Sequence, residues 1–225
     1  MHFSSDFLTY DGSNTDFLGF DNGKRSLPTG AESDRIPTPI SGDSPDQVNN
    51  FLRSFDSTLG PRTMTNPMDY SLGLTLGNQY RVASDKRVGY ILSATYKDSY
   101  THYNDYQYGE YQTQPDPTAF DLIYATRQNG TVSDRNVLAA GLAGVAYKTS
   151  RSKFKLTGMH LQNGESSATN FFIDNSESAP GQSGYNADSY NLVYGERSVT
   201  NFLLRGTHFF SQSNWEIDWR VSPTF

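Results

Sequence analysis

The sequence predicts an all-β protein that forms part of an antiparallel transmembrane β-barrel. Three observations support this prediction: apolar and polar residues alternate in several segments, the connections alternate between short and long, and Tyr and Phe account for 15 and 14 of 225 residues. Alternation places successive side chains on opposite faces of a strand. Aromatic residues form girdles where a barrel wall meets the two membrane surfaces. We expect about six or seven long strands of a larger barrel.

The composition is compatible with a transmembrane β-barrel, and it argues against a helical membrane protein and against a nucleic-acid-binding protein. The mean hydropathy of −0.64 is low, as expected when a strand is apolar on one face only. No segment approaches the ~20 apolar residues of a transmembrane helix. The net charge of −6 provides no basic excess, so we expect no nucleic-acid partner. The first residues do not resemble a signal peptide, and we expect the N-terminus of an exported protein to lie upstream.

The clearest predicted strand spans residues 68–80, where apolar residues share one parity and small or polar residues share the other. A lipid-facing surface with water on the opposite side has this pattern. A soluble sheet covered by a second layer has it as well. The residues that we predict to face lipid here are Met68, Tyr70, Leu72, Leu74 and Leu76.

A second strand begins at Arg87, after a polar turn at 81–86. Val88, Tyr90 and Leu92 extend the predicted lipid-facing belt. About ten residues cross a bilayer as a tilted strand, and this segment continues well past that length. Its tail carries five tyrosines whose apolar rings and polar tips suit sugars or catecholate-like ligands. These candidate ligand contacts are Tyr100, Tyr103, Tyr106, Tyr108 and Tyr111, although packing against neighbouring loops is an alternative role.

The remaining strands follow the same rhythm. Residues 136–149 and 153–163 predict a tight hairpin, although the Ala and Gly of the first segment also permit a short buried helix. Residues 188–210 predict one long strand. A turn at 211–214 leads to a final strand at 215–221, in which charged residues alternate with aromatic and aliphatic ones. The last members of the predicted lipid-facing belt are Phe202, Leu204, Trp215, Ile217 and Trp219.

The lengths of the connections predict which end of the sheet is periplasmic and which is extracellular. Short connections are expected at 81–86, 149–152 and 211–214, and long ones at 11–67, 104–135 and 164–187. Outer-membrane barrels have short periplasmic turns and long extracellular loops. We therefore assign residues 1–67 to a first strand end and a long extracellular loop, and residues 68–225 to strands. Because the smallest single-chain barrels have eight strands, these strands are too few to close.

Four collinear segments, at 6–28, 54–80, 145–175 and 194–223, resemble the early barrel strands and first extracellular loops of Bacteroidetes-type TonB-dependent receptors. The resemblance implies a 22-stranded barrel with an internal plug in the outer membrane of a Gram-negative bacterium. It implies TonB-dependent uptake of a scarce nutrient: a siderophore, cobalamin, an oligosaccharide or a peptide. The partners implied are outer-membrane lipid, that nutrient and, through a plug absent from these residues, the TonB complex. Alone, this segment is expected to be inactive.

Catalytic and metal sites are not expected. The four histidines lack the spacing of known metal motifs, and no Ser/His/Asp set is recognisable. The loop from Asp11 to Asp16 could supply oxygen ligands to Ca²⁺, although an ordinary Asx-rich loop is the more typical interpretation. We expect no cofactor and no enzymatic activity. The competing hypothesis is a secreted β-sandwich that binds carbohydrate through Tyr-rich loops.

Overall fold

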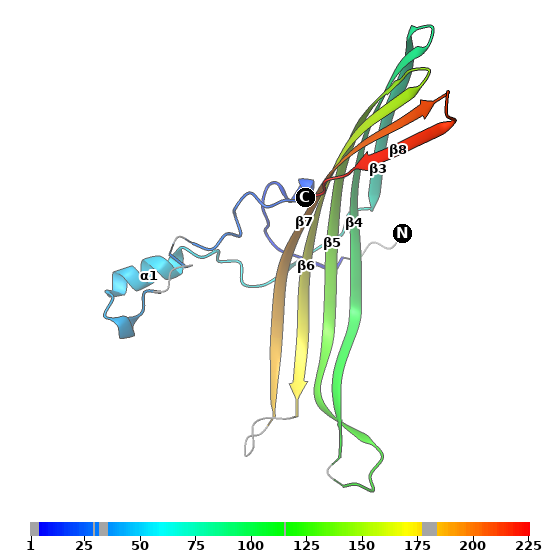
Figure 1. Ribbon diagram of the computed structural model, residues 1–225. Coiled ribbons are helices and arrows are strands. Elements are labelled where there is room, and N and C mark those ends of the chain that lie inside the picture. The colour runs from blue at the N-terminus through cyan, green and yellow to red at the C-terminus, as the bar shows by residue number, and fades with distance from the viewer. Residues whose placement is uncertain (1–4, 29, 32–35, 115, 177–183) are drawn as a thin grey trace.

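The computed structural model describes residues 5–28, 30–31, 36–114, 116–176 and 184–225, and its main feature is one antiparallel six-stranded sheet (Figure 1). Each strand pairs with its neighbours in the sequence, so the sheet is an up-and-down meander. The all-β prediction is confirmed. The strands are β3 (Tyr70–Ala83), β4 (Lys86–Thr113), β5 (Leu122–Lys148), β6 (Ser152–Asn175), β7 (Tyr185–Phe210) and β8 (Trp215–Val221).

The four central strands contain 24 to 28 residues each. This is more than twice the roughly ten residues that cross a bilayer. Figure 1 shows that these strands bend and twist together along their length. Strand β5 includes the whole of residues 136–148, so the alternative of a buried helix there is wrong. The single long strand predicted at 188–210 is confirmed as β7.

Short turns join the strands at one end of the sheet, as predicted. Residues 84–85, 149–151 and 211–214 connect β3–β4, β5–β6 and β7–β8. The first turn is narrower than the predicted 81–86, because the ladder continues to the pair Ala83–Lys86 past a register shift. Asn214 closes the last turn with φ 54, a left-handed conformation that asparagine tolerates better than most residues.

The predicted long connections at 104–135 and 164–187 are wrong in extent, because strands occupy most of both ranges. β4 and β5 remain paired out to Thr113 and Leu122, and β6 and β7 out to Asn175 and Tyr185. These tails mix polar, aromatic and aliphatic residues on both faces, so they lack the alternation that marks a strand in the sequence. Backbone hydrogen bonds form regardless of side-chain polarity, and the neighbouring strands hold the tails in register.

Strand β3 begins at Tyr70, two residues later than predicted. The backbone N–H of Tyr100 donates to Asp69 Oδ1 over 2.8 Å, just past the last ladder pair, Tyr70–Asp98. A side chain thus satisfies an amide of β4 where β3 no longer pairs with it. Met68 lies before the start of the strand, so it is not part of the regular alternation, although its side chain is exposed.

The N-terminal region, predicted as a first strand end and a long loop, forms several small elements. β1 (Phe7–Thr9) pairs with β2 (Arg62–Met64), and between them lie η1 (Asp16–Leu18), η2 (Pro39–Ser41) and α1 (Pro45–Arg53). Ser44 and Gln47 form a capping box at the start of α1, and Pro45 occupies its first turn. Figure 1 shows α1 standing away from the sheet. None of the helices in the described part of the chain has the length and apolar character to cross a membrane.

Candidate membrane interface and ligand surface

The register of the sheet brings the alternate apolar residues of all six strands to one face. Leu76 pairs with Leu92, and further along the sheet Leu156 pairs with Leu204. Directly paired residues point to the same face. We call the resulting surface the apolar belt: Tyr70, Leu72, Leu74, Leu76, Val88, Tyr90, Leu92, Val145, Tyr147, Phe154, Leu156, Phe202, Leu204, Phe210, Trp215, Ile217, Trp219 and Val221.

The apolar belt is uncovered. Leu72, Leu74 and Trp215 are 65%, 62% and 68% exposed. Small residues of β5 and β6, including Gly141 and Gly158, leave an open apolar hollow of about 500 Å³ at its centre. A contiguous apolar surface of this extent marks a protein or membrane contact. Every predicted lipid-facing residue lies on this face except Met68, which precedes β3.

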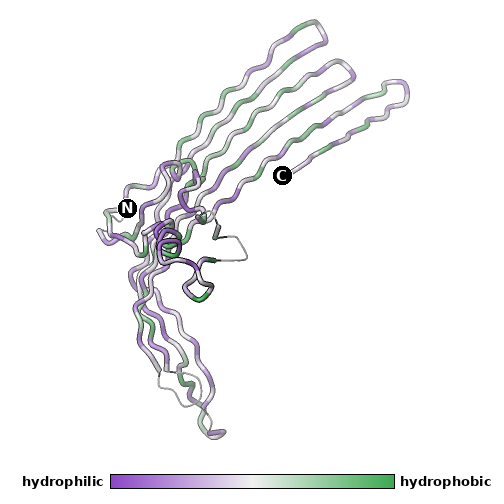
Figure 2. The backbone as a smooth tube through the Cα atoms, turned by 90° about the vertical axis from the view of Figure 1, so that its left-hand side faces the viewer, coloured by the Kyte–Doolittle hydropathy of each residue, from purple (hydrophilic) through white to green (hydrophobic). Residues whose placement is uncertain are grey.

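The opposite face of the sheet, which we call the polar face, carries the polar and charged residues at the same height, together with apolar ones such as Ile91, Leu142 and Met159. Thr75 and Ser93 are bonded through their hydroxyl oxygens, 2.9 Å apart. Arg205 donates to Asp218 Oδ2 over 2.8 Å, so the charged residues that alternate with the belt meet one another here. Figure 2 shows hydrophobic and hydrophilic residues alternating along the strands near the turn end. The two faces of the sheet therefore differ: one presents the apolar belt, and the other is mixed and carries the charged residues.

Residues 7–27, which we call the strap, cross the belt side of the sheet just beyond the apolar belt. The N–H of Leu8 donates to Ser133 Oγ on β5 over 2.9 Å. Gln162 of β6 donates to Gly19 O over 2.6 Å, and the Tyr96 hydroxyl of β4 donates to Phe17 O over 2.7 Å. The cross-strand pairs Leu72–Tyr96, Tyr96–Ala139 and Ala139–Gln162 place these contacts on the belt face.

The strap buries an aromatic cluster and an ion pair. Phe7 is 2% exposed and packs edge-on against Tyr100, with ring centroids 5.5 Å apart. Beside it, Arg135 donates to both oxygens of Asp98 over 3.1 and 2.8 Å. Asp98 is 2% exposed. The hydrogen bonds to Asp98 raise the pKa of Arg135, and this effect is larger than the lowering caused by burial. These contacts hold the strap side of β4 and β5 together.

Arg25 fastens the end of the strap. Its guanidinium donates to Asp16 and Asp21 over 2.6 and 2.7 Å and lies 4.0 Å from the ring centroid of Tyr194 on β7. Burial opposes the charge of Arg25, but the hydrogen bonds and charge of Asp16 raise its pKa. Asp11, at the other end of the loop considered for Ca²⁺, pairs with Arg62 over 2.9 Å. The structure thus engages both carboxylates of that loop in ion pairs.

The five candidate ligand tyrosines lie on two different faces. Tyr100 is on the belt face, under the strap. A register shift between Tyr103 and Tyr106 changes the parity of the strand, and Tyr106 pairs with Gly130 on the polar face. Because Gly130 has no side chain, Tyr106 approaches Phe171 with ring centroids 5.6 Å apart. The register places Tyr103, Tyr106, Tyr108 and Tyr111 on the polar face, all substantially exposed.

An open hollow of about 530 Å³ accompanies these tyrosines. Its lining includes Tyr106, Tyr108 and Phe171 together with the polar groups of Glu110 and Gln128. Regular alternation along the sequence would place Tyr106 and Tyr108 on the same face as Tyr100. The sequence alone therefore does not predict that Tyr106 and Tyr108 share the opposite face with Phe171. The spacing of the tyrosines in the sequence carries no signal of the bulge that moves Tyr106 and Tyr108 to the opposite face.

The histidines form hydrogen bonds with neighbouring hydroxyls. His102 Nδ1 lies 2.8 Å from Ser133 Oγ, and His160 Nδ1 lies 2.8 Å from Thr200 Oγ1. His208 Nδ1 lies 3.0 Å from Ser152 Oγ, and His2 is outside the described residues. Across the described ranges, no three His, Asp or Glu side chains converge in the manner of a metal site.

Comparisons of the chain with protein-family models, with curated proteins and with solved structures gave no match.

Proposed function

We propose that this chain is part of the wall of an outer-membrane β-barrel, with the apolar belt in contact with lipid and the opposite face toward a hydrated interior. The observation that carries the proposal is the continuous, exposed belt across six strands. A membrane wall explains why large side chains such as Leu74 and Trp215 are exposed on one face, while Arg205 and Asp218 occupy the other. It also explains the short turns at one end of the sheet.

The proposal extends to transport. The collinear resemblance to Bacteroidetes-type TonB-dependent receptors supports a role in the uptake of a scarce nutrient, a siderophore, cobalamin, an oligosaccharide or a peptide. In such a receptor, energy reaches the barrel through the TonB complex and the plug. The present chain is then one segment of the wall and is inactive by itself.

The tyrosine surface supplies a candidate ligand contact for this role. Tyr106, Tyr108 and Phe171 present apolar rings beside Glu110 and Gln128. Rings with adjacent polar groups bind amphipathic ligands by stacking and hydrogen bonding. The surface lies on the hydrated face and beyond the apolar belt, where an incoming nutrient would meet the barrel.

The competing β-sandwich hypothesis requires a second sheet over the apolar belt. In the described residues, the second sheet consists of β1 and β2 alone, and the belt remains exposed. The buried apolar residues of that part of the chain are Phe7, Leu8, Val137 and Ala168, in the region of the strap. This distribution supports a wall with a lipid-facing belt over a sandwich with a closed core.

A pair of arginine substitutions on adjacent residues tests the proposal. Leu74→Arg places a charge in the middle of the apolar belt, whereas Thr75→Arg places it on the opposite face of the same strand. Arg at a lipid-facing midplane position costs about 2–4 kcal/mol, and a lumen-facing position tolerates it. In the complete barrel that contains these strands, insertion into phosphatidylcholine vesicles should therefore be impaired by Leu74→Arg and left unchanged by Thr75→Arg. Equal insertion of the two variants would contradict the proposed orientation.

A further inference from the structure

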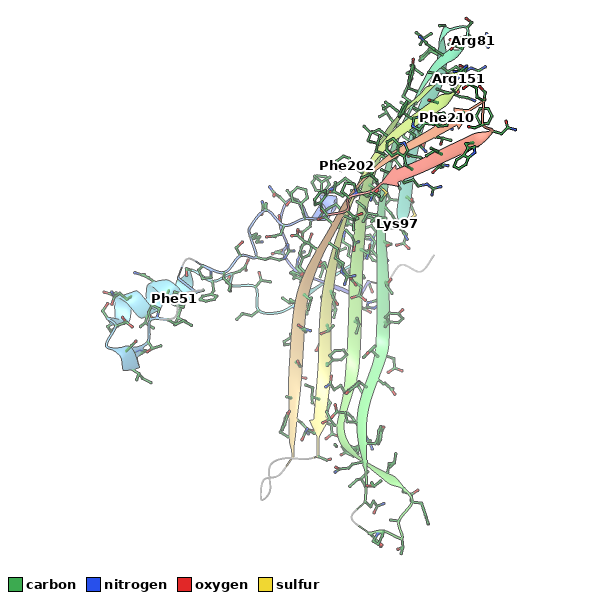
Figure 3. All side chains as sticks on the ribbon, in the orientation of Figure 1. Phe51, Arg81, Lys97, Arg151, Phe202 and Phe210 are labelled. Carbon is green, nitrogen blue, oxygen red and sulfur yellow. The ribbon has the colours of Figure 1, made fainter. Side chains whose placement is uncertain are left out.

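Four cationic side chains stand side by side on the polar face, at the end of the sheet that carries the short turns. The ladder pairs Arg81 with Arg87, Arg87 with Lys148, and Lys148 with Lys153, one residue from each of four adjacent strands. We call these four residues the cation row. With strands about 4.8 Å apart, the row spans roughly 15 Å. Figure 3 labels Arg81 and Arg151 near the short turns and Lys97 farther along the sheet.

The charges of the cation row are not neutralised by ion pairs in the part of the chain that the structure describes. No ion pair of its four members is seen there, and all four are exposed. Asp85, in the turn between β3 and β4, is the carboxylate nearest to the row in the sequence, and none of the ion pairs seen in the described residues joins it to the row. Along the ladder the nearest carboxylate is Asp218, two strands beyond Lys153, and it is engaged by Arg205 and Arg220. Lys155 adds a further cation two residues along β6 and on the same face.

This arrangement is unfavourable unless something anionic covers it. Like charges directly opposite each other in a sheet are destabilising, and this row repeats the repulsion three times. The chain has a net charge of −6, so the row is not a consequence of general basicity. A sheet wall that concentrates cations in this way is suited to an acidic partner, since their potentials are complementary.

We propose that the cation row is a docking site for an acidic polypeptide segment that lies across β3, β4, β5 and β6 on the polar face. An extended peptide of about five residues spans the row. It can supply several carboxylates at once, which one small anion cannot. The location of the site inside a barrel rests on the proposed function, because that proposal makes the polar face the interior. Lipid headgroups are then excluded from the row, since lipid contacts the other face.

The test uses the complete barrel that contains these strands, in phosphatidylcholine vesicles, with a fluorescent deca-glutamate peptide as probe and deca-glutamine as its neutral counterpart. Binding is followed by fluorescence anisotropy at low and high salt. We expect deca-glutamate to bind, deca-glutamine not to bind, and the affinity to fall as salt screens the charges. Removing two row charges with Lys148→Gln and Lys153→Gln should weaken binding about tenfold.

The matched control carries Lys97→Gln and Arg197→Gln, two exposed cations of the same face outside the row. It changes the net charge equally and should alter the affinity less than about twofold. Equal weakening in both double variants would overturn the site, because the probe would be responding to net charge. Displacement of the probe by an equal concentration of inorganic phosphate would overturn the peptide assignment.

The outcomes separate the two proposals. If the complete barrel inserts into vesicles and only Leu74→Arg impairs its insertion, but no row-dependent binding is seen, the docking site is wrong and the membrane wall stands. If the complete barrel fails to insert yet binds the probe in detergent through the row, the membrane wall is wrong and the acidic-peptide site stands on the sheet. Failure of both measurements removes both proposals.

Discussion

Asp98 and Arg135 show how a single pair of side chains fixes the middle of this sheet. They are 37 residues apart in the sequence and lie on adjacent strands, where two hydrogen bonds join them. Asp98 is almost completely buried, so its charge depends on Arg135 for compensation. A buried carboxylate left without its partner is strongly destabilising, even where the intact pair contributes little net stability.

We therefore predict that Arg135→Met lowers the free energy of unfolding by about 2–4 kcal/mol, toward the lower part of the range for buried pairs because Arg135 is partly exposed. Urea unfolding in vesicles or detergent measures the change. Arg197→Met, on an exposed arginine, serves as the control and should stay within about 0.5 kcal/mol of the parent chain. Similar losses in the two variants would show that the pair has no special role.

A second prediction at this scale concerns the tyrosines under the strap. Burial raises the pKa of Tyr100 and of Tyr194 from 10.0 to about 12. Because the folded state favours the neutral phenol, this stability is fully present below about pH 10 and is lost as the pH rises toward about 12. Tyr100→Phe with Tyr194→Phe should flatten this loss of stability.

Ultraviolet difference titration of each Tyr→Phe variant against the parent chain measures the two phenols directly. The same titration in concentrated urea is the control and should return both groups to the ordinary tyrosine range. Titration of Tyr100 and Tyr194 near the ordinary value of about 10 in the folded chain would show that the strap does not bury them.

At the scale of elements, the strap and the sheet meet at a glycine crossing. A Cβ on Gly164 of β6 would lie 2.6 Å from Gly19 Cα, closer than atoms can approach. Gly19 itself has φ 84, which favours glycine. The strap can therefore lie flat on β6 only where both segments carry glycine. The contact between Gly19 and Gly164 thus sets the path of the strap between Phe7 and Arg25.

We predict that Gly164→Ala loosens the strap and lowers stability by about 1–3 kcal/mol, the usual cost of overpacking. Cleavage of the folded protein by trypsin at Lys24 should become faster, because a displaced strap exposes that bond. Gly195→Ala on β7 is the matched control, since a Cβ there meets no atom within 4 Å. If both alanine variants are cut at the parent rate, the crossing does not hold the strap.

At the scale of the whole molecule, the belt face is divided along the length of the strands. The apolar belt occupies the turn end, the strap crosses the middle, and polar tails with exposed residues such as Phe172 extend beyond it. On the opposite face, the cation row lies at the turn end and the tyrosine surface lies in the tails. Under the proposed function, one end of the sheet is in the membrane and the other is in water.

The absence of cysteine allows this division to be measured with single labels. Leu74→Cys and Phe172→Cys both lie on the belt face, the first in the apolar belt and the second in the tail. We predict that lipid slows the reaction of the Leu74→Cys thiol with a water-soluble maleimide more than about tenfold, because thiols in hydrocarbon are inaccessible to the reagent. The Phe172→Cys thiol should react at a nearly unchanged rate. Equal protection of both positions, or of neither, would contradict a membrane at the turn end alone.

Much of the turn end follows from the sequence. The final strand occurs at 215–221 as its alternation predicts, and the hairpin turn around 150–152 and the long strand ending at Phe210 are also found. Here polarity indicates which face a strand residue occupies, because the apolar belt lies on one face and the charged residues lie on the other. Local pattern is then sufficient to fix both the strand and its orientation.

Other features depend on how the strands pair. The tails of β4 to β7 lack a regular alternation of apolar and polar residues, so nothing local distinguishes them from loops. Pairing with neighbouring strands makes them strands. The bulge before Tyr106 moves two predicted ligand tyrosines, Tyr106 and Tyr108, to the face opposite Tyr100. The strap, the Asp98–Arg135 pair and the cation row each join residues distant in sequence. The order of amino acids specifies which residues alternate, whereas the register between strands specifies which of them meet, because contacts across a sheet depend on pairing that no single segment encodes.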